Sequence, residues 1–145
     1  MAFIHKSGRG ATEPFQKLAS TAIAVGSVVG FHSTGYISQA LTASTRVAGI
    51  CIKKVASTDD DYTSNTAIPV IVPGEEDIFE ADVSGTATVA NVGKQYDLTI
   101  VAAGTAQNVD LAVTTNKVVT VVGFISASKV YVKFNSNYVY ANKAN

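Results

Sequence analysis

The sequence predicts an all-β protein built as a compact antiparallel β-barrel or sandwich, preceded by an extended N-terminal arm. The first observation is the choice of apolar residues: the 145 residues include 20 Val, 10 Ile and 15 Thr but only four Leu and one Met. β-Branched side chains lose freedom in helices and pack well on pleated sheets. The second is spacing, because short Val- and Ile-rich runs alternate with turn residues about every 8–12 positions, as in sandwiches and barrels. The third is that no long run shows the helical period of apolar residues.

The first 15 residues stand apart from this pattern and are predicted to form a flexible arm, with residues 16–145 as a single β-domain. Gly8 and Gly10 raise the entropic cost of ordering this segment. Its apolar side chains have no obvious local partner, which favours an arm that docks on another chain over a frayed terminus or an arm packed on its own domain. On this interpretation the melting of the β-domain does not depend on the arm. The predicted partner-binding residues of the arm are Phe3, Ile4, His5, Lys6, Arg9 and Phe15.

Ten strands are expected along the rest of the chain, each bounded by residues that tolerate positive φ or bond their own backbone. Residues 129–134 alternate apolar and polar side chains, which is typical of a strand with one buried face. Residues 118–122 are apolar on both faces, so this strand is either central or covered by a neighbouring subunit. The expected strands are 22–31, 36–40, 47–55, 68–72, 78–83, 95–101, 109–113, 117–126, 129–134 and 138–140.

Composition limits the classes of partner. The 11 basic and 11 acidic side chains balance, which argues against a nucleic-acid binder. No apolar run approaches the ~18 residues of a membrane span, and the N-terminus lacks the apolar core of a signal peptide, so a soluble protein made in the cytosol is expected. Charged residues make up 15% of the chain, against a typical ~25%. Such a low share indicates that partners cover part of the surface, and the chain is expected to form a homo-oligomer.

Residues able to support chemistry are few and scattered, so no enzyme activity, cofactor or metal is expected. His5 and His32 occur outside any metal-ligand spacing, and Cys51 lies alone within an apolar run, where a buried thiol is expected. The run 59–61 lacks the spacing, glycine and closing glutamate of a calcium loop and is interpreted as a solvated loop tip. The run 75–77 is interpreted as a charged turn before the strand at Ile78.

The order of elements from residue 18 to residue 134 resembles the small capsid decoration proteins of tailed bacteriophages. The stretches that carry the resemblance are Ala22-Ile23-Ala24-Val25-Gly26-Ser27-Val28-Val29, the run 47–55, Ile68-Pro69-Val70-Ile71-Val72-Pro73, Ile78-Phe79-Glu80-Ala81-Asp82-Val83-Ser84-Gly85, Val92-Gly93-Lys94-Gln95-Tyr96-Asp97-Leu98 and the final Val-rich hairpin. The resemblance implies a β-tulip-like fold, a homotrimer and attachment to the major capsid protein on the outside of the virion. It implies no active-site residues.

Two rival classes remain open. One is a carbohydrate-binding or adhesive β-sandwich module of a phage head fibre, although the chain has no tryptophan to stack on sugars. The other is a small hydrolase, which would need His32 to converge with carboxylates such as Asp59 or Asp61.

Overall fold

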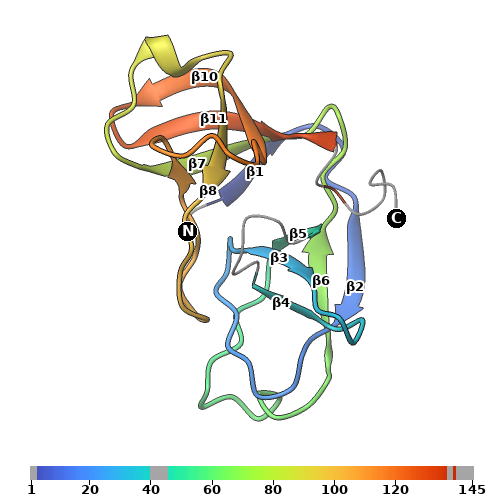
Figure 1. The fold of residues 1–145 in the computed structure, drawn as a ribbon. Helices are drawn as coiled ribbons and strands as arrows, with labels where there is room; N and C mark the ends of the chain where they lie inside the picture. Colours follow the sequence, from blue (N-terminus) through green and yellow to red (C-terminus); the bar gives the residue numbers. More distant parts are fainter. Residues whose placement is uncertain (1–2, 40–45, 137–138, 140–145) are drawn as a thin grey trace.

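The computed structural model describes residues 3–39, 46–136 and 139. Strands make up 45% of the structure and helical residues 3%, so the predicted all-β class is confirmed. The strands form two sheets, seen one above the other in Figure 1. The elements are β1 (Phe3–Ser7), β2 (Thr12–Gln16), β3 (Val28–Phe31), β4 (Ile37–Gln39), β5 (Val47–Cys51), β6 (Ala67–Ile71), β7 (Ile78–Ser84), the 3-10 turn η1 (Val89–Asn91), β8 (Gln95–Leu98), β9 (Val109–Asp110), β10 (Val119–Ser126) and β11 (Lys129–Phe134).

The upper sheet closes into a five-stranded barrel. A barrel is one of the two architectures, barrel or sandwich, that the sequence predicted. Its strand order is β7-β11-β10-β8-β9, and a parallel pairing of β9 with β7 completes the ring, while β1 extends the sheet beyond β7. β11 alternates as predicted, with Val130, Val132 and Phe134 buried. β10 lies between β11 and β8. Its first residues, which are apolar on both faces, therefore belong to a central strand of the sheet. Register shifts in β10 after Val121 and after Phe124 bend it around the barrel.

The lower sheet has the order β2-β6-β5-β3-β4, and a bridge between Lys17 and Ile37 joins its two edges at one point. Every residue of β5 is buried, because the sheet is covered on both faces. The backbone of β5 passes so close to β6 that a Cβ on Gly49 would collide with the carbonyl oxygen of Ile71. A glycine is therefore required at this crossing.

The largest difference from the sequence prediction concerns the predicted arm, residues 1–15. Residues 3–16 form two strands instead of a flexible arm: β1 pairs with β7 of the barrel, and β2 pairs with β6 of the lower sheet. We call this segment the strap, since it crosses from one sheet to the other (Figure 1). The prediction failed because each strap strand has only five residues and its partner strand lies far away in the sequence, where local periodicity gives no signal.

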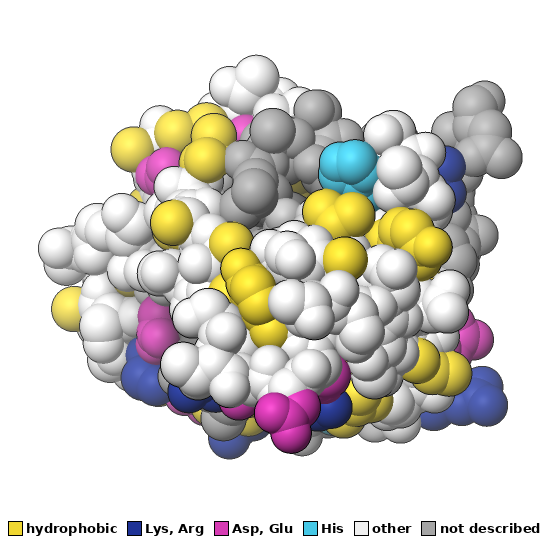
Figure 2. Space-filling view, turned by 90° about the horizontal axis from the view of Figure 1, so that it is seen from below, with side chains coloured by type: hydrophobic (Ala, Val, Ile, Leu, Met, Phe, Trp, Pro, Cys, Tyr) yellow, Lys and Arg dark blue, Asp and Glu magenta, His cyan; other side chains and the backbone are white. Residues whose placement is uncertain are grey.

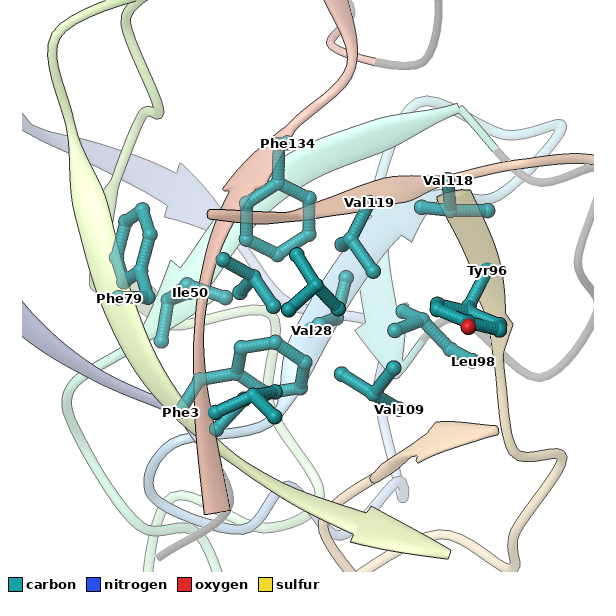
Figure 3. Packing of buried hydrophobic residues seen from close by; sticks show 14 of the residues in the cluster. Phe3, Val28, Ile50, Phe79, Tyr96, Leu98, Val109, Val118, Val119 and Phe134 are labelled. Carbon is teal, nitrogen blue, oxygen red and sulfur yellow. The ribbon is translucent and has the colours of Figure 1, made fainter. Parts of the chain in front are cut away.

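One hydrophobic core joins the two sheets. Figure 3 shows Val28 and Ile50 of the lower sheet pointing into the same interior as Phe79, Val109 and Phe134 of the barrel. Phe3 of the strap lies in this core with 2% of its surface exposed, and its ring centroid is 5.6 Å from that of Phe134. Because both sheets contribute to one interior, the barrel and the lower sheet form a single packed body.

A second core lies on the other face of the lower sheet, where the long loops before β3 and after β5 cover it. Its buried members are Ile23, Val29, Ile37, Ala48, Cys51, Val55, Ile68 and Val70. Cys51 is fully buried, as the sequence predicted. Burial raises the pKa of its thiol, which donates a hydrogen bond to the carbonyl oxygen of Lys53 (2.8 Å).

Two buried glutamines tie the loop between β8 and β9 to the lower sheet. The Gln107 amide bonds both the N–H and the carbonyl oxygen of Val28, each at 2.9 Å. Gln39 donates to the carbonyl oxygen of Thr105 (2.7 Å) and accepts from the N–H of Gly104 (3.0 Å). The loop forms no strand here, so these side-chain amides make the hydrogen bonds that a strand backbone would make. They therefore fix the position of the loop.

Nine predicted strands overlap observed ones, and the differences lie at their ends. Residues 22–27 precede β3 as a loop, where the Ser27 hydroxyl donates to the carbonyl oxygen of Ala24 (2.6 Å). Of the predicted last strand, residues 138 and 140 lie outside the described residues, while Val139 is buried and bridges Val47.

Candidate interaction surface

The six residues predicted to bind a partner are distributed over the strap, and only some of them reach the surface. Phe3 is buried in the core, and Phe15 packs edge-on against Phe31 with 5.5 Å between ring centroids. These two are structural anchors of this chain, so the prediction that they lack local partners is wrong. Lys6 and Arg9 are exposed, while Ile4 and His5 are partly buried.

β1 brings Lys6 to the outer face of the barrel. In the register of β1, β7 and β11, Glu80 lies opposite both Ile4 and Tyr131. Alternation along β7 buries Phe79 and Ala81, so Glu80 points outward between them. We define the outer barrel face as Ile4, Lys6, Ile78, Glu80, Asp82, Val122, Lys129 and Tyr131.

A row of ion pairs crosses this face. Oε1 of Glu80 lies 3.2 Å from Nζ of Lys129, and Oε2 of Glu80 lies 3.3 Å from Nζ of Lys6. Nζ of Lys129 also lies 3.5 Å from Oδ1 of Asp82. Hydrogen bonds from Lys129 and then Lys6 hold the pKa of Glu80 below its usual value, while Glu80 and Asp82 raise the pKa of Lys129. These ion pairs orient the side chains. Because they are exposed to solvent, they contribute only modestly to the stability of the fold.

A shallow groove of about 290 Å³ lies beside the ion pairs. The groove is lined by Ile78, Val122 and Tyr131, and Lys6 and Ser7 lie at its border. Val122 is 38% exposed. An apolar centre with a charged border is the usual composition of a protein–protein contact surface.

A second groove, of about 270 Å³, lies where the strap passes the lower sheet, and it is lined mostly by apolar residues that include Ile4, Ile50 and Ile71. Ile52 on its border is 45% exposed. The backbone N–H of Phe3 donates to the carbonyl oxygen of Gly26 (3.2 Å), which closes one part of the gap between β1 and the lower sheet.

His5 is bound within the chain. Its Nε2 lies 2.9 Å from Oδ1 of Asp77, and its ring packs edge-on against Phe79 with 5.4 Å between centroids. Asp77 belongs to the run 75–77 that the sequence suggested was a charged turn, yet it is 1% exposed. A buried carboxylate with several donors has a structural role that its neighbours Glu75 and Glu76, both exposed, do not share.

Each residue of the rival hydrolase bonds a different neighbour. His32 bonds the Thr34 hydroxyl within its own turn (3.1 Å), Asp59 accepts the N–H of Ala56 (2.8 Å), and Asp61 pairs with Lys53 (3.0 Å). Across residues 3–39, 46–136 and 139, no three or more His, Cys, Asp or Glu side chains gather in a way that could hold a metal ion.

Exposed apolar side chains occur on both sheets and their loops. The larger ones are Ile52, Val89, Val92, Ile100, Val113, Val122 and Phe124. On the described part of the end opposite the barrel, hydrophobic side chains form small separate groups, while charged side chains lie around the rim (Figure 2). In the described part of the chain, no helix is long and apolar enough to cross a membrane.

Sequence reasoning missed the buried polar residues that organise the fold. Lys17 is fully buried, and its ammonium donates to the carbonyl oxygens of Tyr62 (2.7 Å) and Leu18 (3.3 Å). Burial lowers the pKa of Lys17, and the charge of Asp61 partly opposes this effect. The buried Asp97 accepts the N–H groups of Asn116 (2.8 Å) and Lys117 (2.7 Å) and so shapes the loop before β10. A single lysine such as Lys17 carries no local signal of burial in the sequence.

Comparison with models of protein families, with curated proteins and with solved structures found no match for this chain.

Proposed function

We propose that this chain is a structural protein of a bacteriophage virion, which binds the outer surface of the capsid as a homo-oligomer and stabilises the shell. The capsid partner follows from the sequence resemblance to decoration proteins. The surface comes from one observation: the outer barrel face combines an apolar groove with an ordered row of ion pairs. Such a protein needs a rigid contact surface and no reaction chemistry. It would be made in the cytoplasm of the host bacterium and would bind neither nucleic acid nor membrane.

The oligomer is proposed to be a trimer. Apolar side chains as exposed as Ile100 (72%) and Val89 (68%) would be partly covered by sister subunits. Many weak contacts on a repeating shell add up through multivalency, so each subunit needs only a modest interface. Ligands that bind only the assembled shell stabilise it by mass action.

Co-sedimentation with capsids tests the proposal, and the chain offers a matched pair of variants. Val122 on the outer barrel face and Val113 elsewhere are 38% and 37% exposed. We expect Val122→Asp to weaken capsid retention at least about tenfold, because a buried unpaired charge costs more than 1.4 kcal/mol. Val113→Asp should bind like the unmodified protein, and both variants should keep its melting temperature. Unmodified protein that binds no capsid from its own phage would reject the function, whereas equal binding by Val122→Asp would reject only this surface.

A carbohydrate-binding role is the second candidate, because Tyr131 lines the groove of the outer barrel face and aromatic rings can pack against sugars. If the free protein bound glycans and Tyr131→Ala abolished this binding, the carbohydrate-binding role would be favoured over capsid attachment.

A further inference from the structure

The carboxylate of Asp77 joins three segments of the chain. Oδ1 accepts hydrogen bonds from Nε2 of His5 on β1 (2.9 Å) and from the backbone N–H of Gly10 in the turn between β1 and β2 (2.9 Å). Oδ2 accepts the backbone N–H of Gly74, in the loop before β7 (2.7 Å). Because Asp77 is 1% exposed, water does not replace these donors.

The strap turn, residues 8–11, lies directly on the Asp77 backbone. A Cβ on Gly8 would come within 2.7 Å of Cα of Asp77 and of the carbonyl oxygen of Glu76, and Gly8 has φ +98°. The side chains of Arg9 and Ala11 are exposed, so they add little apolar burial. The turn is therefore held mainly by the Asp77 carboxylate and by the bond from the N–H of Val72 to the carbonyl oxygen of Ala11 (2.8 Å).

We propose that Asp77 is an acid-sensitive latch: its ionised carboxylate fixes the strap turn, and its protonation frees this turn while the barrel stays folded. A neutral carboxyl group is a weaker acceptor, and its new O–H would compete for space with the donors of Gly10, Gly74 or His5.

The direction of the pH effect follows from the same contacts. Burial raises the pKa of Asp77, but the hydrogen bonds from Gly74, Gly10 and His5 more than offset it, so the pKa lies below its ordinary value. A group with a lowered folded-state pKa stabilises the bonded state above the unfolded value, ~3.9 for Asp. That contribution is lost as the pH falls through the folded pKa, so the latch opens in acid.

The titratable groups that face Asp77 are few in the described segments packed against it. β1 contributes His5, and the loop before β7 contributes Glu76, whose Oε2 lies on the same side of Gly74 as the Asp77 carboxylate. β7 contributes the apolar Phe79. Glu75 and Arg9 are exposed neighbours.

The rest of the strap should stay in place when the latch opens. β1 remains paired with β7 through Phe3, Ile4 and His5, and β2 pairs with β6 over its whole length. Phe3 remains in the core. Lys6 and Ser7 border the groove of the outer barrel face, and Ile78, next to Asp77, lines it. On the proposed function, the opened latch also loosens this docking surface.

Amide hydrogen exchange of the free protein, followed by NMR from pH 7 down to about pH 1.5, tests the latch, because the folded-state pKa of Asp77 lies below its ordinary value. Protection factors of the Gly10 and Gly74 amides should fall together by about tenfold or more in acid, since both donate to a charged acceptor. The Val121 amide in β10 should keep its protection. In the same samples, the carboxyl carbon of Asp77 should titrate in step with the two glycine amides.

Three variants identify the titrating group. Asp77→Asn should show low protection at Gly10 at every pH and no acid step, whereas His5→Gln should keep the step. Asp60→Asn, an exposed carboxylate neutralised in the same way, should behave like the unmodified protein. The proposal is overturned if Asp77→Asn keeps the acid step, if Asp77 titrates without a change at Gly10, or if Val121 loses protection at the same pH. If Asp77→Asn does not fold, the Asp77 titration in the unmodified protein decides. Capsid retention in acid is measured separately, so failure of the docking link leaves the latch result intact.

Discussion

Replacing Phe3 by alanine should destabilise the free protein by about 3–5 kcal/mol. The side chain is 2% exposed and its ring packs against Phe134. Full burial of a phenylalanine contributes about 1.5–3 kcal/mol, and an aromatic pair adds about 0.5–1.5 kcal/mol. The cavity left by truncation accounts for the remainder. A domain is stable by about 5–15 kcal/mol, so this one substitution should remove a large share.

Urea unfolding and thermal melting of the free protein measure this loss. At about 2–4 °C per kcal/mol, the melting temperature of Phe3→Ala should fall by roughly 6–20 °C. Phe3→Leu should lose far less, because it keeps most of the apolar volume, and Ile4→Ala on the partly exposed side of β1 is a second control. If deletion of residues 1–12 left melting unchanged, the strap would be the free arm that sequence reasoning suggested and the burial of Phe3 would be wrong.

Three further predictions concern buried and exposed polar groups. Gln107→Ala should destabilise the protein by about 1–3 kcal/mol for each backbone group of Val28 left unpaired. Urea unfolding would show this loss, and an unchanged midpoint would contradict the stabilising role of these two hydrogen bonds. Burial lowers the pKa of Lys17, so the unfolded state binds more protons between the two pKa values, and stability should rise with pH in the alkaline range. Lys17→Met should lack this rise in pH-dependent melting. EDTA should leave the melting temperature unchanged, because Asp59 and Asp61 already bond a backbone N–H and Lys53, and a sharp drop would reveal a metal there.

The barrel and most of the lower sheet could be predicted from the sequence because their strands repeat a local rule. Residues 129–134 show it best: alternate residues are apolar, and those residues are buried. The strand ends were less predictable, since the loop 22–27 is as apolar as the strand that follows it. The predicted strand 47–55 ends early, at Cys51, and beyond it Val55 forms only an isolated bridge with Ile23.

The strap could not be predicted for a different reason. Phe3 and Phe15 signalled that residues 1–15 bury apolar surface, but the sequence could not say whose surface receives them. The answer depends on partners such as Phe79 and Phe134, which lie far along the chain. The interaction surface was only partly predictable for the same reason. Lys6 was a predicted contact residue, while Val122 and Tyr131 join it only through the register of four strands, β1, β7, β11 and β10.

The strap also constrains the order in which the protein can fold on the ribosome. Its residues are synthesised before the strands with which they pair: β1 has no partner until β7 emerges, and Phe3 has no complete pocket until β11 does. The bond between His5 and Asp77 spans 72 residues. Contacts of such long sequence separation slow folding, so in a nascent chain the partly apolar β1 would stay unpaired until β7 is made. Completion of the hairpin of β10 and β11 would then enclose Phe3, which is synthesised well before it.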